Sequence, residues 1–280
     1  VFPDDYSVAD LLLPDSASLS DLLEARDVPT LARLISLAEN RPEHYSKLQE
    51  SFPRPENPAP VLGITGTGGD GKSSLVDELV RRFLNHHPDR TLGIISVDPS
   101  KRKTGGALLG DRIRMNDIAL DRGVFIRSMA TRGTLGGVCQ GARDVARILD
   151  AAGHEVVLIE TVGVGQDEIE VVKAADLVVV VCVPGQGDGV QTLKAGIMEI
   201  ADLFVVNKAD REGAEELVAD IRSMLALRAG RGGESPPVLQ TCALSGEGVD
   251  ALVAALLERA GARGGPRERA EARVREEILT

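Results

Sequence analysis

From residue 61 onward, short apolar runs alternate with longer amphipathic stretches. Several of the short runs are apolar throughout, as expected for strands covered on both faces of a sheet. We predict strands at 61–65, 92–97, 124–128, 156–161, 177–183, 203–206 and 238–241. The stretches between them fit helices, for example at 72–85, 138–152, 190–200, 214–227 and 248–260. This alternation predicts an α/β fold with a mostly parallel, doubly wound sheet.

The segments on either side of this region follow different patterns. Residues 1–50 carry apolar positions at helical spacing, and Asp27-Val28-Pro29-Thr30 is a helix start signal, so we predict an N-terminal helical region. Residues 51–60 contain four prolines and are predicted to form an extended linker. The main domain is predicted to span 61–260. The charged tail, 261–280, is either a solvated helix or an arm for self-association.

Composition narrows the choice of partners and compartment. The formal net charge of −11 predicts repulsion from nucleic acid and from anionic membrane surfaces. Aromatic residues make up only 2%, which argues against base-stacking platforms. The acidic start of the chain does not resemble a signal peptide, and the longest apolar run is strand-sized, so we expect a cytoplasmic protein without a membrane segment. Three widely spaced cysteines (Cys139, Cys182 and Cys242) indicate reduced thiols rather than disulfides or a zinc site.

A phosphate-binding loop follows the first predicted strand. The segment from Gly66 to Ser73 fits the pattern G-x-x-x-x-G-K-[ST] and lies between a strand and a helix, which predicts a P-loop NTPase. Its glycines allow backbone N–H groups to surround a phosphate, and the helix directs its positive dipole end at the same oxygens. Lys72 is predicted to bridge the β- and γ-phosphates. The residues predicted to bind nucleotide here are Gly68, Gly69, Asp70, Gly71, Lys72, Ser73 and Ser74.

The base is predicted from a second motif, Asn207-Lys208-Ala209-Asp210, which ends a late strand with the pattern N-K-x-D. The carboxylate of Asp210 can accept two hydrogen bonds from guanine, whereas adenine presents no such pair of donors. Asn207 can reach the opposite edge of the base, and the stem of Lys208 can cover its face. A further strand ends at Cys242, Ala243 and Leu244, where a backbone N–H can meet guanine O6; an ordinary strand end is the alternative. We therefore predict a G domain that binds GTP and GDP.

Three carboxylates are candidates for a Mg2+ site. Glu160 ends a strand in Glu160-Thr161-Val162-Gly163, where most GTPases have Asp and where the glycine senses the γ-phosphate. Asp98 follows another strand, and Asp111 follows a glycine-rich stretch that could move as switch loops do. With the hydroxyl of Ser73 they would supply the oxygen ligands that Mg2+ prefers. Helix N-capping by Asp98 and a surface ion pair of Asp111 are the alternatives.

These motifs together resemble the MeaB/ArgK family, and the match covers roughly residues 15–260. It runs through the phosphate loop, Ser96 to Ser100, Thr104 to Met115, Arg127 to Gly133, Glu160 to Gln166 and Asn207 to Asp210. Members of this family are G-protein chaperones of adenosylcobalamin-dependent acyl-CoA mutases, which gate cofactor loading and protect or reactivate the mutase. The phosphate loop, with Gly69-Asp70, is most similar to the G domain of fused isobutyryl-CoA mutases.

The resemblance also implies residue roles and partners. It places Asp98, Asp111 and Glu160 in the Mg2+ and catalytic cluster, and Lys72 of the phosphate loop is also predicted to be catalytic. It further implies a third switch loop that signals to the mutase, with Asp188, Gln191 and Lys194 as candidate relay residues. We expect a homodimer with an acyl-CoA mutase as client. The chain has no Asp-x-His-x-x-Gly motif, so we do not expect it to bind cobalamin through a histidine.

Intrinsic GTP hydrolysis is predicted to be slow and to be stimulated by a partner. Gln166 matches a water-orienting residue only loosely, and the sequence offers no arginine finger. Two alternatives remain at this point: a GTP-dependent metallochaperone of the kind that loads nickel, and a kinase acting in amino-acid uptake. A tight Ni2+ or Zn2+ site would favour the first, and transfer of labelled phosphate to an acceptor would favour the second.

Overall fold

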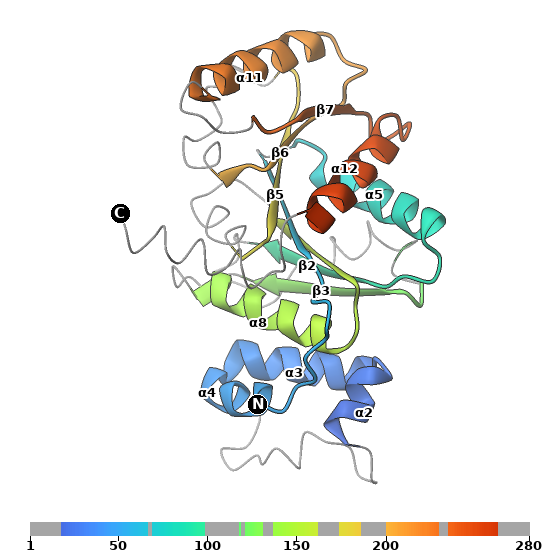
Figure 1. The fold of residues 1–280 in the computed structure, drawn as a ribbon, viewed down its shortest axis with the longest axis vertical. Coiled ribbons are helices and arrows are strands. Elements are labelled where there is room, and N and C mark those ends of the chain that lie inside the picture. The colour runs from blue at the N-terminus through green and yellow to red at the C-terminus, as the bar shows by residue number, and fades with distance from the viewer. Residues whose placement is uncertain are drawn as a thin grey trace.

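The computed structural model describes residues 18–66, 69–98, 118, 121–130, 137–161, 174–185, 200–229 and 235–262. Its centre is a seven-stranded sheet in which every pair of neighbouring strands is parallel (Figure 1). The strands are β1 (Val61–Gly66), β2 (Leu92–Asp98), β3 (Val124–Ala130), β4 (Val156–Thr161), β5 (Leu177–Cys182), β6 (Leu203–Asn207) and β7 (Val238–Thr241). Their spatial order is β3-β2-β4-β1-β5-β6-β7. β2 and β3 lie on one side of β1, β4 returns to the place between β1 and β2, and β5, β6 and β7 follow on the other side. The predicted α/β, doubly wound fold is confirmed.

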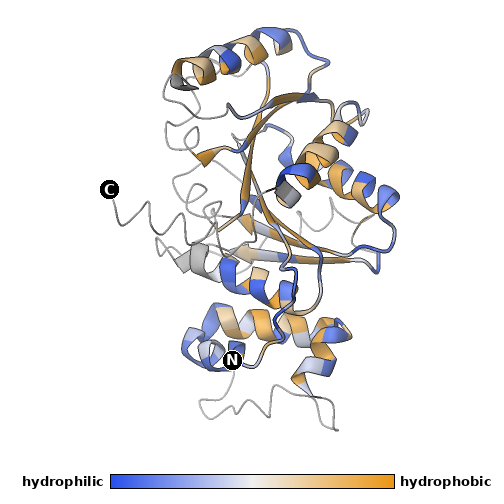
Figure 2. Cartoon of the chain, in the orientation of Figure 1, coloured by the Kyte–Doolittle hydropathy of each residue, from blue (hydrophilic) through white to orange (hydrophobic). Residues whose placement is uncertain are grey.

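Helices cover both faces of this sheet. One face is covered by α5 (Lys72–His86) and α12 (Val249–Ala262), and the opposite face by α8 (Gly137–Ala151) and α11 (Ala214–Ala229). Because successive side chains of a strand point to opposite faces, neighbours such as Ile94 and Ile95 enter different cores. The strands are correspondingly hydrophobic along most of their length, whereas the outer helix surfaces are hydrophilic (Figure 2). Burial on both faces is the reason that these strands show continuous apolar runs.

Within the described part of the chain, three short helices precede the sheet: α2 (Leu19–Glu24), α3 (Val28–Asn40) and α4 (Pro42–Gln49). The predicted start signal of α3 is confirmed, since Asp27 is the N-cap and its carboxylate accepts a hydrogen bond of 2.9 Å from the backbone N–H of Thr30. α3 packs against α8, and the buried hydroxyl of Tyr45 in α4 donates to the carbonyl of Asp144 in α8 at 3.0 Å. The N-terminal helices therefore share one hydrophobic core with β2, β4 and α8.

The stretch 51–60 forms neither helix nor strand, as expected from its prolines. It is anchored at its end, where the backbone N–H of Ala59 donates to the carboxylate of Asp150 at 2.7 Å. This contact fixes the entry of the chain into β1. The helix predicted at 190–200 and most of the tail 261–280 lie outside the described residues.

Candidate functional site

The predicted nucleotide-binding residues gather at the carboxyl ends of the central strands. β1 lies between β4 and β5 in the sheet, and the chain turns to opposite sides after it. In open α/β sheets, ligands bind at such a switch point, in the crevice outside the carboxyl ends of the strands. The phosphate loop follows β1, Glu160 lies near the end of β4, and the N-K-x-D motif begins with Asn207, the last residue of β6.

The backbone of the phosphate loop depends on glycine at two positions. A Cβ on Gly66, whose φ is +152°, would lie 2.2 Å from the carbonyl oxygen of Val181 in β5. A Cβ on Gly71, whose φ is +76°, would lie 2.9 Å from Nδ2 of Asn207. Both positions therefore exclude a side chain on steric and conformational grounds. The loop consequently lies against β5 and against the N-K-x-D motif.

Helix α5 begins directly after this loop. Its N-cap is Gly71, so no side chain caps its first N–H groups, which are a ready site for a phosphate. Lys72 is buried, and its ammonium donates a hydrogen bond of 2.7 Å to the carbonyl of Gly66. Ser74 is exposed on the first turn of the same helix. The ammonium thus lies inside the loop, where it can contact a phosphate.

The adjacent hydroxyl and carboxylate of Ser73 and Glu160 fit a Mg2+ site. Ser73 Oγ donates to Glu160 Oε1 at 2.6 Å, and Glu160 is only 1% exposed. Both groups offer the oxygen ligands that Mg2+ prefers, and they lie beside the N-terminus of α5. Asp98 is the last residue of β2, and its neighbours Ser96 and Val97 pair in register with Glu160 and Thr161. The backbone of Asp98 therefore lies at the same edge of the sheet as Glu160.

Asn207 connects the base motif to the phosphate loop. Its Nδ2 donates to the carbonyl of Asp70 at 2.9 Å, and its Oδ1 accepts hydrogen bonds of 3.2 Å from the hydroxyl of Thr241 and the N–H of Ala243. The side chain is 1% exposed. Lys208 adds a second link, since its ammonium donates to the carbonyl of Gly69 at 2.7 Å. The sequence motif predicts contacts of these side chains with the base alone and does not predict this link, because no local pattern records a contact between residues so far apart.

The remaining residues of the predicted base site lie around this link. Asp210 is exposed, so its carboxylate is accessible to a base. Cys242 is buried and pairs through its backbone with Glu247, whereas the Leu244 side chain is 93% exposed. A backbone N–H of this segment is predicted to meet guanine O6, and in the structure the N–H of Ala243 donates to Asn207. The position of this N–H is therefore set by Asn207 and by the segment from Cys242 to Glu247.

The position of the Asp70 side chain could not be predicted from the sequence. Its side chain is fully buried, and its Oδ2 lies 3.0 Å from the position that a Cβ would have at Gly66. Burial, and after it the charge of Asp70, raise the pKa of the Cys182 thiol, at the end of β5, to about 12. The carboxylate of Asp70 thus lies beneath the loop, near the ends of β1 and β5, and it is the backbone of Asp70 that bonds to Asn207.

Several predicted site residues lie outside the described part of the chain, as the side chain of Asp98 also does, and their roles stay predictions. They are Gly68, Asp111, Gly163, Asp188, Gln191 and Lys194.

Within the residues that the structure describes, no group of three or more His, Cys, Asp or Glu side chains is arranged to hold a metal ion. None of the helices in the described ranges combines the length and the apolar character that crossing a membrane requires.

Comparison with known proteins identifies the family. Residues 31–279 match the family described as methylmalonyl Co-A mutase-associated GTPase MeaB. The chain belongs to the MeaB family. This confirms the resemblance read from the motifs, and a MeaB-family GTPase with this fold binds guanine nucleotide.

Individual MeaB relatives agree with this assignment. A Pyrococcus abyssi protein that is named as a GTPase is 44% identical to this chain over 272 residues. The aligned region is 94% of this chain and 82% of the relative. The fused isobutyryl-CoA mutase of Geobacillus kaustophilus is 46% identical over 202 residues, which are 69% of this chain but only 18% of that protein. The crystal structure of an LAO/AO transport system kinase superimposes with a TM-score of 0.69 at 27% identity, covering 93% of this chain and 82% of the other.

Proposed function

We propose that this chain hydrolyses GTP and acts as a chaperone of an adenosylcobalamin-dependent acyl-CoA mutase, gating cofactor loading and protecting or reactivating the enzyme. The observation that carries the proposal is the similarity of 69% of this chain to one part of a fused isobutyryl-CoA mutase. In that protein, a segment of this kind is covalently joined to a mutase. In this proposal, a separate chain of the same family binds its mutase non-covalently.

The described residues can support phosphoryl transfer by positioning and charge neutralisation. In this proposal the ammonium of Lys72 contacts the β- and γ-phosphates, and the first N–H groups of α5 bind their oxygens. Ser73 and Glu160, with Asp98 and Asp111, hold Mg2+, which when bound neutralises charge on the phosphates. Asp210 accepts hydrogen bonds from guanine, and the segment from Cys242 to Leu244 supplies a backbone N–H to O6.

The finer parts of the proposal concern the partner and the assembly. Asp188, Gln191 and Lys194 relay the nucleotide state to the mutase, and the chain acts as a homodimer in the cytoplasm. Hydrolysis by the chain alone is slow, because positioning of the attacking water depends on the partner. A rate of roughly 10 per second without a partner, far above that of unaided small GTPases, would contradict this proposal.

The test measures phosphate release from GTP, with ATP as the control nucleotide, alone and with a panel of adenosylcobalamin-dependent acyl-CoA mutases. Stimulation by one mutase, together with little ATP turnover, supports the proposal and identifies the client. Lys72→Ala should abolish both the basal and the stimulated rate. If no mutase in the panel changes the GTP rate, the chaperone function is wrong, although the GTPase assignment stands.

A further inference from the structure

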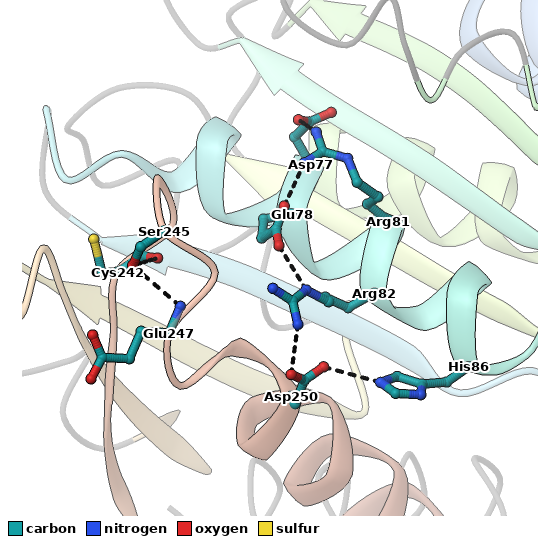
Figure 3. Close-up of polar contacts among 9 residues, drawn as sticks. All are labelled: Asp77, Glu78, Arg81, Arg82, His86, Cys242, Ser245, Glu247 and Asp250. Carbon is teal, nitrogen blue, oxygen red and sulfur yellow. Dashed lines mark hydrogen bonds and ion pairs between the residues drawn. The ribbon is translucent and has the colours of Figure 1, made fainter.

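A chain of ion pairs joins helix α5 to helix α12 on the face away from α8. Arg82 Nε donates to Glu78 Oε1 at 2.8 Å, and Arg82 Nη1 donates to Asp250 Oδ2 at 2.7 Å (Figure 3). The other oxygen of Asp250 lies 3.0 Å from Nε2 of His86. Glu78 is largely buried, and Arg82 is about one-third exposed. Arg82 thus bridges two carboxylates, one on each helix, with the directional geometry that a guanidinium allows.

The loop that leads into α12 rests on this bridge. We call residues 242–248 the base loop, since they follow β7 and include Ala243. A Cβ on Gly246 would lie 2.2 Å from Arg82 Nη2 and 2.7 Å from Glu78 Oε1. The bridge therefore packs directly against the backbone of Gly246, at a position where φ is +77° and only glycine fits without strain. In Figure 3, Ser245 and Glu247, the neighbours of Gly246 in sequence, lie on the loop opposite Glu78 and Arg82, and the carboxylate of Glu247 points away from Arg82.

Hydrogen bonds inside the base loop make it a compact unit. The N–H of Cys242 donates to the carbonyl of Glu247 at 2.9 Å, and the N–H of Gly246 donates to the carbonyl of Cys242 at 2.8 Å. Ala243 lies inside this turn, and its N–H bonds to Asn207. Because the turn is closed, a displacement of Gly246 is transmitted to Ala243. Asp250 lies in the first turn of α12, directly after the loop, so the bridge also fixes the far end of the loop.

We propose that Arg82, held by Glu78 and Asp250, is a positioning residue that sets the base loop for guanine. The inference rests on the proposed nucleotide site, because the loop is assigned to the base through Ala243. In this arrangement, the helix that starts at the phosphate loop also supports the loop that contacts the base. Arg82 does not touch the nucleotide; it acts through Gly246 and α12.

The test measures the dissociation constants of GDP, IDP and ADP at a temperature where every variant is folded. IDP keeps O6 and N1–H of guanine but lacks the 2-amino group, so it removes one of the two hydrogen bonds proposed for Asp210 and leaves the proposed contact with the base loop intact. Arg82→Ala should raise the dissociation constants of GDP and IDP by the same factor, about tenfold. This factor corresponds to the loss of one hydrogen bond between neutral groups. ADP binding, which reports the phosphate loop, should stay within about twofold.

Arg81→Ala is the matched control. Arg81 neighbours Arg82 on α5 and also pairs with Glu78, but its second partner is Asp77 rather than Asp250. Its loss should leave all three dissociation constants within about twofold. Asp250→Ala should raise the dissociation constant of GDP by the same factor as Arg82→Ala. The double variant should bind GDP no more weakly than either single variant, because both changes break the same bridge.

Three results overturn the inference. Equal effects of Arg81→Ala and Arg82→Ala on GDP would show that the bridge to α12 is irrelevant to the base. Equal weakening of GDP and ADP by Arg82→Ala would place the effect in the phosphate loop. Equal binding of GDP and ADP by the unaltered chain would refute the base-site assignment itself, which is a failure of the proposed function that precedes any result with Arg82.

Discussion

The hydroxyl of Ser73 and the carboxylate of Glu160 lie 2.6 Å apart, joining the first turn of α5 to the end of β4. Most GTPases have an aspartate in the motif to which Glu160 belongs. The longer glutamate reaches the serine directly, and its carboxylate is buried beside the N-terminus of the helix. These two residues therefore define where Mg2+ is expected to bind.

Removing either group should reduce Mg2+-dependent hydrolysis. Ser73→Ala and Glu160→Gln are each expected to lower the GTP turnover rate about 10- to 100-fold and to raise the Mg2+ concentration needed for half-maximal rate. The measurement is the rate of phosphate release across a Mg2+ titration. Ser73→Thr is the matched control, because it keeps the hydroxyl and should keep most of the rate. If Ser73→Ala and Glu160→Gln both left the Mg2+ dependence of the rate unchanged, the proposed Mg2+ site would be wrong.

Asn207 should contribute to stability as well as to nucleotide binding. Asn207→Ala removes buried hydrogen bonds to Asp70, Thr241 and Ala243, so the free energy of unfolding should fall by about 2–3 kcal/mol. Urea unfolding of the nucleotide-free chain measures this loss. Asp210→Ala is the control, because this side chain is exposed. It should raise the dissociation constant of GDP about 10- to 100-fold and change the free energy of unfolding by less than about 0.5 kcal/mol. If both variants had the same stability, the link between the base motif and the phosphate loop would not be energetically significant.

His154 should make the fold less stable in mild acid. Burial lowers the pKa of His154 to about 4, and its ring Nδ1 lies 3.1 Å from the carbonyl of Leu149. The unfolded chain takes up a proton at this residue below about pH 6.5, whereas the folded chain does so only near pH 4. Stability is therefore lost as the pH falls through this window, by about 2 kcal/mol between pH 7 and pH 5.

Urea unfolding at the two pH values tests the contribution of His154. His154→Asn should flatten the pH dependence between them by that amount. The same change at the exposed His44 should leave the pH dependence as it is in the unaltered chain. Equal slopes for the unaltered chain and His154→Asn would mean that another group accounts for the acid sensitivity.

The docking of the N-terminal helices should depend on Tyr45. Tyr45→Phe keeps the buried ring and removes only the hydrogen bond to the carbonyl of Asp144, so the free energy of unfolding should fall by about 1–2 kcal/mol. Ser46→Ala is the neighbouring control, since this hydroxyl bonds within its own exposed helix turn and its loss should cost less than about 0.5 kcal/mol. Two separate unfolding transitions would show that the N-terminal helices fold independently of the sheet.

The sequence predicted the sheet well because its strands are buried on both faces. Each predicted strand is present, with ends that differ by at most two residues, and the helices at 72–85, 138–152, 214–227 and 248–260 agree equally well. Glycine and proline mark most of the breaks, and hydrophobic periodicity separates the two kinds of element. The motif residues could also be placed, because the carboxyl ends of parallel strands meet at one edge of the sheet.

Contacts between distant parts of the chain could not be predicted from the sequence. Asn207 bonds to Asp70, and Arg82 packs on Gly246, yet each pair is separated by more than a hundred residues. Asp70 belongs to a motif that predicts nucleotide contact, and only the three-dimensional arrangement shows its carboxylate buried beneath the loop. These contacts arise from the way the helices and loops pack over the sheet, and the local sequence carries no signal for them.

In the proposed function, the bound nucleotide controls the association of this chain with an acyl-CoA mutase. A ligand can bias a partner only through a difference in affinity between states, and the effect is reciprocal. The most direct measurement is calorimetric titration of a mutase into the chain saturated with GDP or with a non-hydrolysable GTP analogue, both with Mg2+. We expect the dissociation constants of the two nucleotide states to differ by at least about fivefold. Equal dissociation constants in the two states, for every mutase tested, would contradict the proposed function.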